Sequence, residues 1–498
     1  MKKVLFVTSE AHPLIKTGGL ADVSGSLPRA LAELGQNMRL LLPRYHALET
    51  TGAEYQCRID LEGVSVDILE TRLPDSEVIV WLMDYPEYFG KPGNPYLDEQ
   101  GKPWIDSAER FTLFCRSAVE IAMGRSELDW QADIVHCNDW QSGLVPALLS
   151  VEENPPATVF TIHNMAYQGL FPRSKFVSLN LPASLWNPDG LEFYDMLSFI
   201  KGGIAYADRI TTVSPTYALE IQTPEFGCGL EGLLSHRQDE LSGIINGIDQ
   251  DYWNPDTDEY IPQQYKSTTL QKKSLNKTSL QRTFALPVNE EIPVIALISR
   301  LVQQKGIDLV IDSLPHLVSM PLQFIVLGSG DRSYERRLQN LAGLYPEKIA
   351  ISLGYNEKLS HLIEAGADIF FMPSRFEPCG LNQMYSQRYG TLPIVRRTGG
   401  LADTVVDALP HSIENQSATG IVFNEPAADS LLEATKRAIV LFQDKKSWKT
   451  IQQTGMNKDF SWQNSAVQYL RIYQELRPAA ALKSNAESPT PAGVGASV

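Results

Sequence analysis

The sequence predicts an α/β chain that contains two doubly wound, mainly parallel sheets. Short apolar runs, typical of buried parallel strands, alternate with helix-length segments in both halves of the 498 residues. A polar stretch separates the halves, and the hexapeptide T-G-G-L-A-D occurs once in each of them. Because a single core stops growing well below this length, two domains are expected.

The first half opens with a strand, a helix and a second strand. Residues 4–8 form a mainly apolar run, and apolar residues then recur at helical spacing from Leu20 to Leu34 before the run 38–42. Further apolar runs between breakers predict buried strands at 134–137, 158–162 and 210–213.

The same rhythm restarts in the second half, where five runs predict strands at 294–298, 324–327, 349–353, 369–372 and 392–395. We therefore expect an N-terminal Rossmann-like domain at 1–248, an interdomain stretch at 249–277, a C-terminal Rossmann-like domain at 278–460, a helix at 461–476 and a tail at 477–498. The tail is rich in Ala, Ser, Pro and Gly, so we expect it to be disordered.

Composition excludes several classes of partner. The formal charge of −16 disfavours nucleic acid and anionic membranes, and no apolar run approaches the roughly 18 residues of a membrane span. The start of the chain lacks the features of a signal peptide, and the five cysteines are scattered without a C-x-x-C pair. These features predict a cytoplasmic protein without a structural metal site.

The two T-G-G-L-A-D copies follow strands and open helices, as K-T-G-G-L-A-D from Lys16 and R-T-G-G-L-A-D from Arg397. Glycines allow close backbone approach, and a helix N-terminus attracts anions. A Gly-Gly pair alone is more often a simple turn, but the duplication favours a ligand. Since strand ends of both halves are expected to face one cleft, a ligand there could meet both turns.

Two further motifs lie at strand ends of the second half. S-R-L-V-Q-Q-K-G contains Arg300 and Lys305, and two cations at such a place suit the diphosphate of a departing nucleotide; the alternative is a solvated surface pair. P-S-R-F-E-P-C-G-L-N-Q contains Glu377, which suits sugar hydroxyls or an oxocarbenium-like centre, or simply caps the next helix. Amides at Gly380 and Leu381 suit phosphate oxygens, whereas Cys379 reads as a packed thiol.

In the first half, N-D-W-Q with Asp139 and T-I-H-N-M with His163 also follow strands and are sugar-contact candidates. A structural histidine and a helix-capping aspartate are the alternatives. Two D-x-D tripeptides, at Asp249 and Asp256, lie in the polar stretch and read as solvated rather than metal-binding.

Taken in order, K-T-G-G-L-A-D, H-C-N-D-W-Q, T-I-H-N, I-N-G-I-D, S-R-L-x-x-Q-K-G, F-E-P-C-G-L and R-T-G-G-L-A-D resemble the bacterial glycogen synthases and plant starch synthases. The resemblance runs from Lys3 to about Leu476. It implies a GT-B fold whose C-terminal helix returns to the N-terminal domain. It also implies transfer of glucose from ADP-glucose to the non-reducing end of an α-1,4-glucan such as glycogen, with retention of configuration and without a metal or cofactor.

The resemblance also assigns roles to individual residues. It implies that Glu377, Arg300, Lys305, His163 and Asp139 are catalytic. The residues that it places at ADP-glucose are Lys16, Gly18, Gly19, Asn246, Arg300, Lys305, Tyr355 near the adenine, Cys379, Gly380, Leu381 and Thr398. Asn382 departs from the family pattern, in which threonine is common.

Three alternatives stay open on the sequence. Retention can proceed through a glycosyl-enzyme on Glu377 or through a same-face displacement guided by the phosphate. A sugar-nucleotide isomerase would use the same fold without an acceptor. A non-catalytic glycan or nucleotide sensor would bind without turnover and would not need the cations or Glu377.

Overall fold

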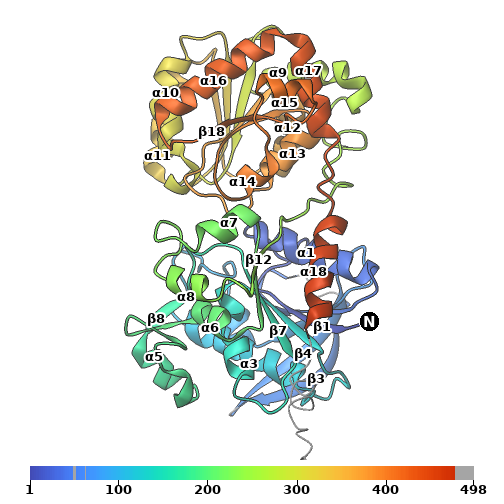
Figure 1. Cartoon of the computed structure of the whole chain (residues 1–498), viewed down its shortest axis with the longest axis vertical. Helices are drawn as coiled ribbons and strands as arrows, with labels where there is room; N and C mark the ends of the chain where they lie inside the picture. Colours follow the sequence, from blue (N-terminus) through green and yellow to red (C-terminus); the bar gives the residue numbers. More distant parts are fainter. Residues whose placement is uncertain (49–51, 62, 477–498) are drawn as a thin grey trace, which may run out of the picture. The chain divides into compact units, whose positions relative to one another are not determined.

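A computed structural model describes residues 1–48, 52–61 and 63–476 (Figure 1). The predicted tail at 477–498 lies outside these residues. The chain divides into two compact units, each interrupted in sequence. The first comprises Met1–Thr211, Gly227–Ser242 and the segment that begins at Ala466; the second comprises Thr212–Phe226 and Gly243–Ser465. Residues 249–277, assigned above to an interdomain stretch, belong to the second unit, where Tyr265 and Leu270 are buried.

A nine-stranded sheet organises the first unit. Its order is β12 (Leu241–Gly243), β11 (Arg209–Thr212), β7 (Ala157–Ile162), β6 (Ile134–Asn138), β1 (Lys3–Val7), β2 (Asn37–Pro43), β5 (Ile79–Asp84), β4 (Val64–Arg72) and β3 (Glu54–Leu61). Strand β1 pairs in parallel with β2 on one side and with β6 on the other. The chain therefore reverses its direction of travel across the sheet between β1 and β6, which makes this the topological switch point.

The edge of this sheet differs from the purely parallel pattern that the apolar runs suggest. Strands β3, β4 and β5 pair antiparallel with one another, and the sequence analysis assigned none of them. Strand β3 alternates exposed and buried residues over much of its length because one face is open to solvent. A separate antiparallel sheet, also unassigned, contains β8 (Leu170–Pro172), β10 (Met196–Ser198) and β9 (Glu192–Phe193).

The helices of the first unit are α1 (Gly19–Glu33), α2 (Pro86–Phe89), α3 (Ser107–Ala122), α4 (Leu144–Leu149), α5 (Arg173–Ser178), α6 (Phe199–Tyr206), α8 (Glu231–His236) and most of α18 (Trp462–Glu475), with 3₁₀ helices η1 (Trp140–Ser142) and η2 (Ala183–Leu185). Helix α1 buries Leu20, Val23, Leu27 and Leu31, the apolar residues at helical spacing. Helix α18 contributes buried Tyr469 and Tyr473 to the first unit, as expected for a C-terminal helix that returns to the N-terminal domain.

The second unit is built on a six-stranded sheet of order β15 (Ile349–Leu353), β14 (Gln323–Gly328), β13 (Val294–Ile298), β16 (Ile369–Met372), β17 (Leu392–Arg396) and β18 (Ile421–Phe423). All its pairings are parallel. Strands β14 and β15 lie on one side of β13 and the later strands on the other, so the switch point falls between β13 and β16.

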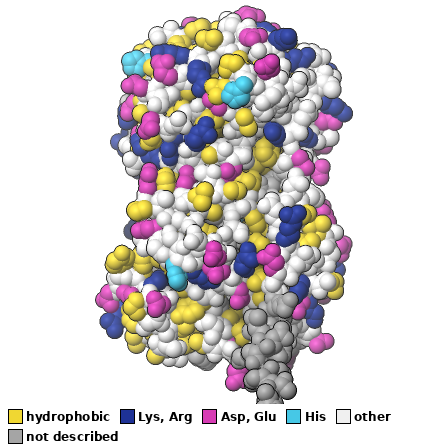
Figure 2. All heavy atoms as spheres, in the orientation of Figure 1, with side chains coloured by type: hydrophobic (Ala, Val, Ile, Leu, Met, Phe, Trp, Pro, Cys, Tyr) yellow, Lys and Arg dark blue, Asp and Glu magenta, His cyan; other side chains and the backbone are white. Residues whose placement is uncertain are grey.

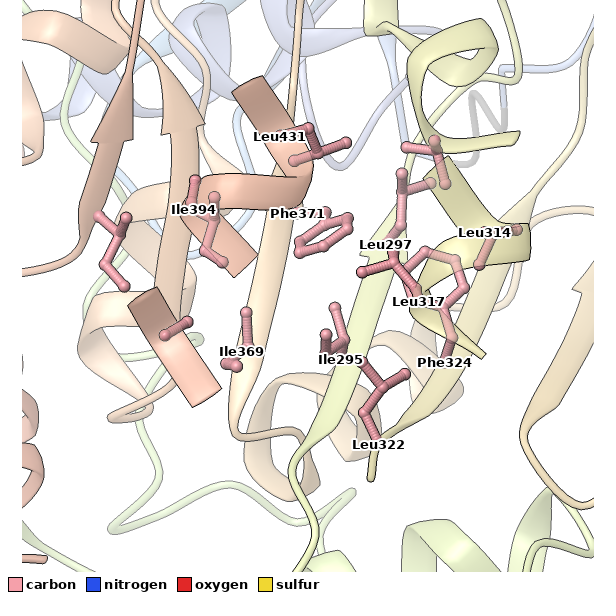
Figure 3. Close-up of a cluster of buried hydrophobic side chains, with 14 of the residues drawn as sticks. Ile295, Leu297, Leu314, Leu317, Leu322, Phe324, Ile369, Phe371, Ile394 and Leu431 are labelled. Carbon is pink, nitrogen blue, oxygen red and sulfur yellow. The ribbon is translucent and has the colours of Figure 1, made fainter. Parts of the chain in front are cut away.

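Helices cover both faces of this sheet. The helices of the second unit are α7 (Pro215–Glu220), α9 (Lys273–Thr283), α10 (Ile307–Leu317), α11 (Arg332–Leu344), α12 (Glu357–Gly366), α13 (Asn382–Arg388), α14 (Gly399–Thr404), α15 (Pro410–Glu414), α16 (Ala428–Gln443) and α17 (Lys445–Met456), with 3₁₀ helices η3 (Ser267–Lys272) and η4 (Gln303–Lys305). Ile295 and Leu297 of β13 enter one buried cluster, with Leu314 of α10 and Leu431 of α16 (Figure 3). Val294 and Ala296 enter a second cluster. Burial of both faces explains why the strands read as continuous apolar runs.

Acidic and basic side chains are interspersed over the face drawn in Figure 2. Among the helices that the structure describes, none combines the length and apolar character needed to cross a bilayer.

Candidate functional site

The candidate residues of the first unit gather at the switch point between β1 and β6. Strand β1 ends at Val7 and leads into the turn that carries Lys16, Gly18 and Gly19. Strand β6 ends at Asn138, directly before Asp139, and the adjacent β7 ends at Ile162, directly before His163. Ligands of doubly wound sheets bind at the carboxyl ends of the strands at such a point.

The turn before α1 is exposed and is held from inside by Glu10, which the sequence analysis missed. The Glu10 carboxylate accepts the amides of Thr17 and of Gly18, the latter at 3.0 Å. Lys16 pairs with Asp22 at 2.8 Å. A Cβ on Gly18 would meet no heavy atom within 4 Å, so its glycine identity is not required by packing.

Asp139 and His163 lie together, and Asp139 does not cap a helix. Its Oδ1 accepts the His163 amide at 2.7 Å, and no side-chain hydrogen bond caps η1. Burial, together with the nearby Glu10 charge, raises the pKa of Asp139 to about 7, although the amides of His163 and Asn164 lower it. The His163 ring lies 3.0 Å from Asn138 Oδ1, and burial lowers the His163 pKa to about 3, so the imidazole is neutral.

The first unit also contains a pocket of about 480 Å³. Aromatic and aliphatic side chains line much of it, among them Trp104, Trp140, Tyr167, Leu170 and Phe171. Gly169 has a positive φ of 61°, and a Cβ there would lie 2.4 Å from the Trp140 ring. Trp140 immediately follows Asp139, and its ring gives this pocket a surface suited to the apolar face of a sugar.

In the second unit, the candidates at the ends of β13 and β16 come together. Lys305 Nζ lies 2.5 Å from Glu377 Oε2, and Ser374 donates to the same oxygen at 2.9 Å. Glu377 is 5% exposed. Gly306, which ends η4, has a φ of 69°, and a Cβ there would lie 2.1 Å from the Pro373 carbonyl oxygen. The backbone therefore brings the Lys305 loop directly against the Glu377 loop.

Arg300 and Tyr355 occupy exposed positions at the same edge of the second sheet. Arg300 follows β13, and Tyr355 follows β15 and is 76% exposed. The Tyr355 hydroxyl donates to Glu357. Both side chains are therefore at the solvent side of the strand ends.

The segment after Glu377 is a packed turn that begins α13. Cys379 is buried, and burial raises its pKa to about 12 although the Asn246 amide hydrogen bond lowers it, so the thiol stays protonated. Asn246 is buried, and its Oδ1 has no hydrogen-bond partner among residues 1–48, 52–61 and 63–476. Gly380, with φ of 72°, and Leu381 precede Asn382, the first residue of α13.

Asn382, the departure from the family pattern, has a structural contact. Its side-chain amide donates to the Ile298 carbonyl at the end of β13, at 2.9 Å. The amide thus ties α13 to the neighbouring strand.

The second T-G-G-L-A-D turn is used differently from the first. Thr398 is buried, and Glu220 accepts its hydroxyl at 2.9 Å and the Gly399 amide at 3.0 Å. A Cβ on Gly399 would lie 1.9 Å from the Glu377 carbonyl oxygen. A Cβ on Gly400 would lie 2.2 Å from the Cys379 carbonyl oxygen. These glycines therefore allow the turn to pack against the Glu377 loop.

Arg396 is a second residue that the sequence analysis missed. It is 8% exposed and donates to the carbonyl oxygens of Ser374, at 2.9 Å, and of Arg375. A third bond reaches Asn424 at 3.3 Å. The only sequence signal is an arginine at the end of an apolar strand, a place where charges are rare.

Comparisons with known proteins cover both halves of the chain. A family model described as the starch synthase catalytic domain matches residues 3–236, and one for group 1 glycosyl transferases matches 281–453. Glycogen synthase 1 of Methylococcus capsulatus is 55% identical over 474 residues, with 95% of this chain and 96% of that protein covered. The glycogen synthase of Cellvibrio japonicus is 51% identical, with 96% and 100% covered.

Two solved structures are also similar. The catalytic domain of starch synthase IV from Arabidopsis thaliana, bound to ADP and acarbose, has a TM-score of 0.86 and 32% identity, covering 95% of this chain and 99% of that one. Sucrose-phosphate synthase from Thermosynechococcus elongatus, with a TM-score of 0.59 and 15% identity over 95% and 99% of the two chains, shares the fold. With two Rossmann-like units, matching models over both halves and half-identical relatives of equal length, the chain belongs to the glycogen synthase and starch synthase family of GT-B glycosyltransferases.

Proposed function

We propose that this chain transfers glucose from ADP-glucose to the non-reducing end of an α-1,4-glucan, with retention of configuration. The observation that carries the proposal is the Lys305–Glu377 contact at the switch point of the second sheet. In the contact a cation, which suits a leaving phosphate, lies beside a carboxylate, which suits a sugar. The relatives named glycogen synthase and the starch synthase bound to ADP supply the donor and the acceptor class.

In this proposal, Arg300 and Lys305 stabilise the departing ADP. Negative charge grows on the phosphate oxygens as the bond to the glucose C1 breaks, and side-chain cations stabilise that charge without a metal ion. Amides at Gly380 and Leu381 add donors for phosphate oxygens. Lys16, in the turn before α1, is also proposed to contact ADP-glucose. Tyr355 supplies an exposed ring for the adenine.

The surroundings of Glu377 favour a same-face displacement over a glycosyl-enzyme. One carboxylate oxygen already accepts from Lys305 and Ser374, which lowers its nucleophilicity. Glu377 then holds the glucose and stabilises positive charge at C1. The acceptor hydroxyl attacks C1 on the face that ADP leaves, and its proton passes to the leaving phosphate oxygen.

The acceptor glucan is assigned to the first unit. The pocket beside Trp140 offers aromatic surface for glucose rings, while Asp139 and neutral His163 offer hydrogen bonds to hydroxyls. Among the residues that the structure describes, Cys57, Cys115, Cys137, Cys228 and Cys379 form no disulfide, which supports a cytoplasmic location for this reaction.

The test is chain elongation with labelled glucose. The purified chain is incubated with glycogen and ADP-glucose, in parallel with UDP-glucose, and with or without EDTA. We expect label in α-1,4 linkage at glucan ends from ADP-glucose, unchanged by EDTA. No elongation with any nucleotide-glucose would refute the proposal, and loss of activity in EDTA would refute its metal-free form.

A further inference from the structure

The turn from Lys16 to Gly19 depends on a buried carboxylate that is distant from solvent. Glu10 is 2% exposed, whereas Lys16, Gly18 and Gly19 are exposed. One Glu10 oxygen, Oε2, accepts the amides of Thr17 and Gly18. Burying a carboxylate costs free energy unless hydrogen-bond donors surround it. The contacts therefore stabilise both the Glu10 carboxylate and the turn whose amides it accepts.

The other oxygen connects the turn to a second loop. Glu10 Oε1 accepts the hydroxyl of Tyr96, which also lies 2.9 Å from the hydroxyl of Ser9. Tyr96 is 86 residues away in sequence. The carboxylate therefore joins the end of β1, the turn before α1 and the loop before α3 into one hydrogen-bonded group.

Glu10 leaves the exposed donors of the turn available. The backbone amides of Thr17 and Gly18 donate to Glu10. The Gly19 amide, by contrast, makes no hydrogen bond to any residue that the structure describes. Gly19 is the first residue of α1, where amides have no partner within the helix. The side of the turn that faces solvent thus keeps the Gly19 amide and the Lys16 ammonium, which is paired with Asp22 at the surface, while the inner side is fixed.

The second copy of the motif repeats this arrangement within its own unit. Glu220 accepts the Thr398 hydroxyl and the Gly399 amide, at the positions equivalent to Thr17 and Gly18. In both turns a glutamate oxygen therefore accepts hydrogen bonds from the second and third residues of K/R-T-G-G. In the second copy the turn packs on the Glu377 loop, whereas in the first its outer side is open.

We propose that Glu10 is a positioning residue of the donor site, whose carboxylate, fixed by Tyr96, holds the Lys16–Gly19 turn in the conformation that receives the nucleotide sugar. The proposal rests on the proposed function for the identity of the donor. Without Glu10, two amides turn to water and the turn samples other conformations. The ordering cost is then met when the donor binds, which raises the KM for the donor.

The test measures KM for both substrates in Glu10→Ala, Glu10→Asp and Glu10→Gln. We expect Glu10→Ala to raise the KM for ADP-glucose by about 10- to 100-fold, with kcat and the KM for glycogen changed by less than about 3-fold. Glu10→Asp keeps the charge but is too short to reach both the turn and Tyr96, so we expect a rise of the same kind. Glu10→Gln keeps a side-chain oxygen that can accept the amides of Thr17 and Gly18. Its KM for ADP-glucose should therefore be much closer to that of wild type than to that of Glu10→Ala.

Glu54→Gln, at an exposed site on β3, is the matched control for loss of a carboxylate. If Glu10→Ala does not fold, Glu10→Asp decides the question. An unchanged donor KM in a folded Glu10→Asp, or an equal rise in the KM for glycogen, would overturn the proposal.

Calorimetric binding of ADP alone separates this proposal from the proposed function. A wild-type protein that binds ADP but does not elongate glycogen contradicts the function, while the ratio of ADP Kd between Glu10→Asp and wild type still tests the turn. Equal Kd values would overturn the role of Glu10, and weaker binding by about 10-fold or more would support it.

Discussion

At the scale of single residues, the chemistry proposed for the second unit depends on one ion pair. Lys305 and Glu377 are 20% and 7% exposed in their side chains, so each reduces the cost of placing the other away from water. Ser374 supplies a second donor to the same carboxylate oxygen. The pair therefore has both a structural and a proposed catalytic role, and a substitution must be judged on both.

Lys305→Met should lower glucose transfer strongly. It removes the cation proposed for the leaving phosphate, and we expect kcat to fall by about 100-fold or more. It also leaves Glu377 with Ser374 alone, which should cost about 1–3 kcal/mol of stability. Steady-state kinetics and urea unfolding measure the two effects. Lys436→Met, an exposed lysine paired only with Glu433, is the control; equal kinetics in both variants would contradict the role of Lys305.

Asp139→Asn should change how stability depends on pH. Because burial raises the Asp139 pKa from 3.8 to about 7, the folded state binds more protons than the unfolded state between these values. This group therefore makes the free energy of unfolding fall as pH rises through that window, by at most about 1.4 kcal/mol per pH unit. Asparagine lacks this dependence.

Thermal unfolding of wild type and Asp139→Asn between pH 5 and 8 checks this prediction. As pH rises to about 7, the free energy of unfolding of the variant should increase relative to that of wild type. Above pH 7 the difference between the two should be constant. Asp239→Asn, at an exposed site, controls for the loss of a carboxylate. Parallel curves for Asp139→Asn and wild type would show that the carboxyl does not titrate in this range.

At the scale of elements, one hexapeptide forms two turns with different requirements for glycine. Both turns begin a helix and both bind a glutamate. In the second turn the Gly399 backbone has a φ of 43° and touches the Glu377 loop, whereas the equivalent Gly18 is extended, with a φ of −152°. The neighbours of each turn, not its sequence, decide how strictly glycine is needed.

Gly399→Ala and Gly18→Ala form a matched pair that tests this difference. The alanine Cβ at 399 combines a strained φ with a 1.9 Å approach to the Glu377 carbonyl oxygen, so we expect a loss of about 3 kcal/mol or more and little transfer activity. Gly18→Ala should cost less than about 1 kcal/mol. Urea unfolding of both variants measures the costs, and similar values would contradict the packing argument.

At the scale of the whole molecule, the first unit is completed by the C-terminal helix. A buried series of hydrogen bonds runs from Tyr473 of α18 to His136 of β6 at 2.6 Å, then to Thr161 and on to Thr211. Burial lowers the His136 pKa to about 3, so the imidazole is neutral and one ring nitrogen must accept. Helix α18 is thus part of the core around the first strands.

Tyr473→Phe should weaken the whole first unit. It removes the partner of His136 Nδ1 and leaves a buried polar atom without a hydrogen bond, which costs about 1–3 kcal/mol. Gln474→Ala, on the exposed side of the same helix, should change stability by less than about 0.5 kcal/mol. Urea unfolding followed by tryptophan fluorescence compares them, and a Tyr473→Phe midpoint equal to that of wild type would contradict the prediction.

Much of this arrangement follows from local patterns. Apolar runs predicted the central strands of both sheets to within a residue or two, because strands buried on both faces must be apolar throughout. The antiparallel edge from β3 to β5 was not assigned. Residues of an edge strand alternate between exposed and buried, and the local sequence of such a strand does not specify which strand it pairs with. The site candidates follow strands, which is why sequence reasoning found Lys16, Asp139, Lys305 and Glu377.

The sequence by itself determined two doubly wound sheets, the residues at their strand ends and the family to which the motifs point. Only the tertiary structure decided which of those residues meet. Lys305 and Glu377 are 72 residues apart in sequence, Glu10 and Tyr96 are 86 residues apart, and Tyr473 and His136 are 337 residues apart. Periodicity and turn chemistry act over a few neighbouring residues, whereas these contacts depend on strand order and on where each loop crosses a sheet.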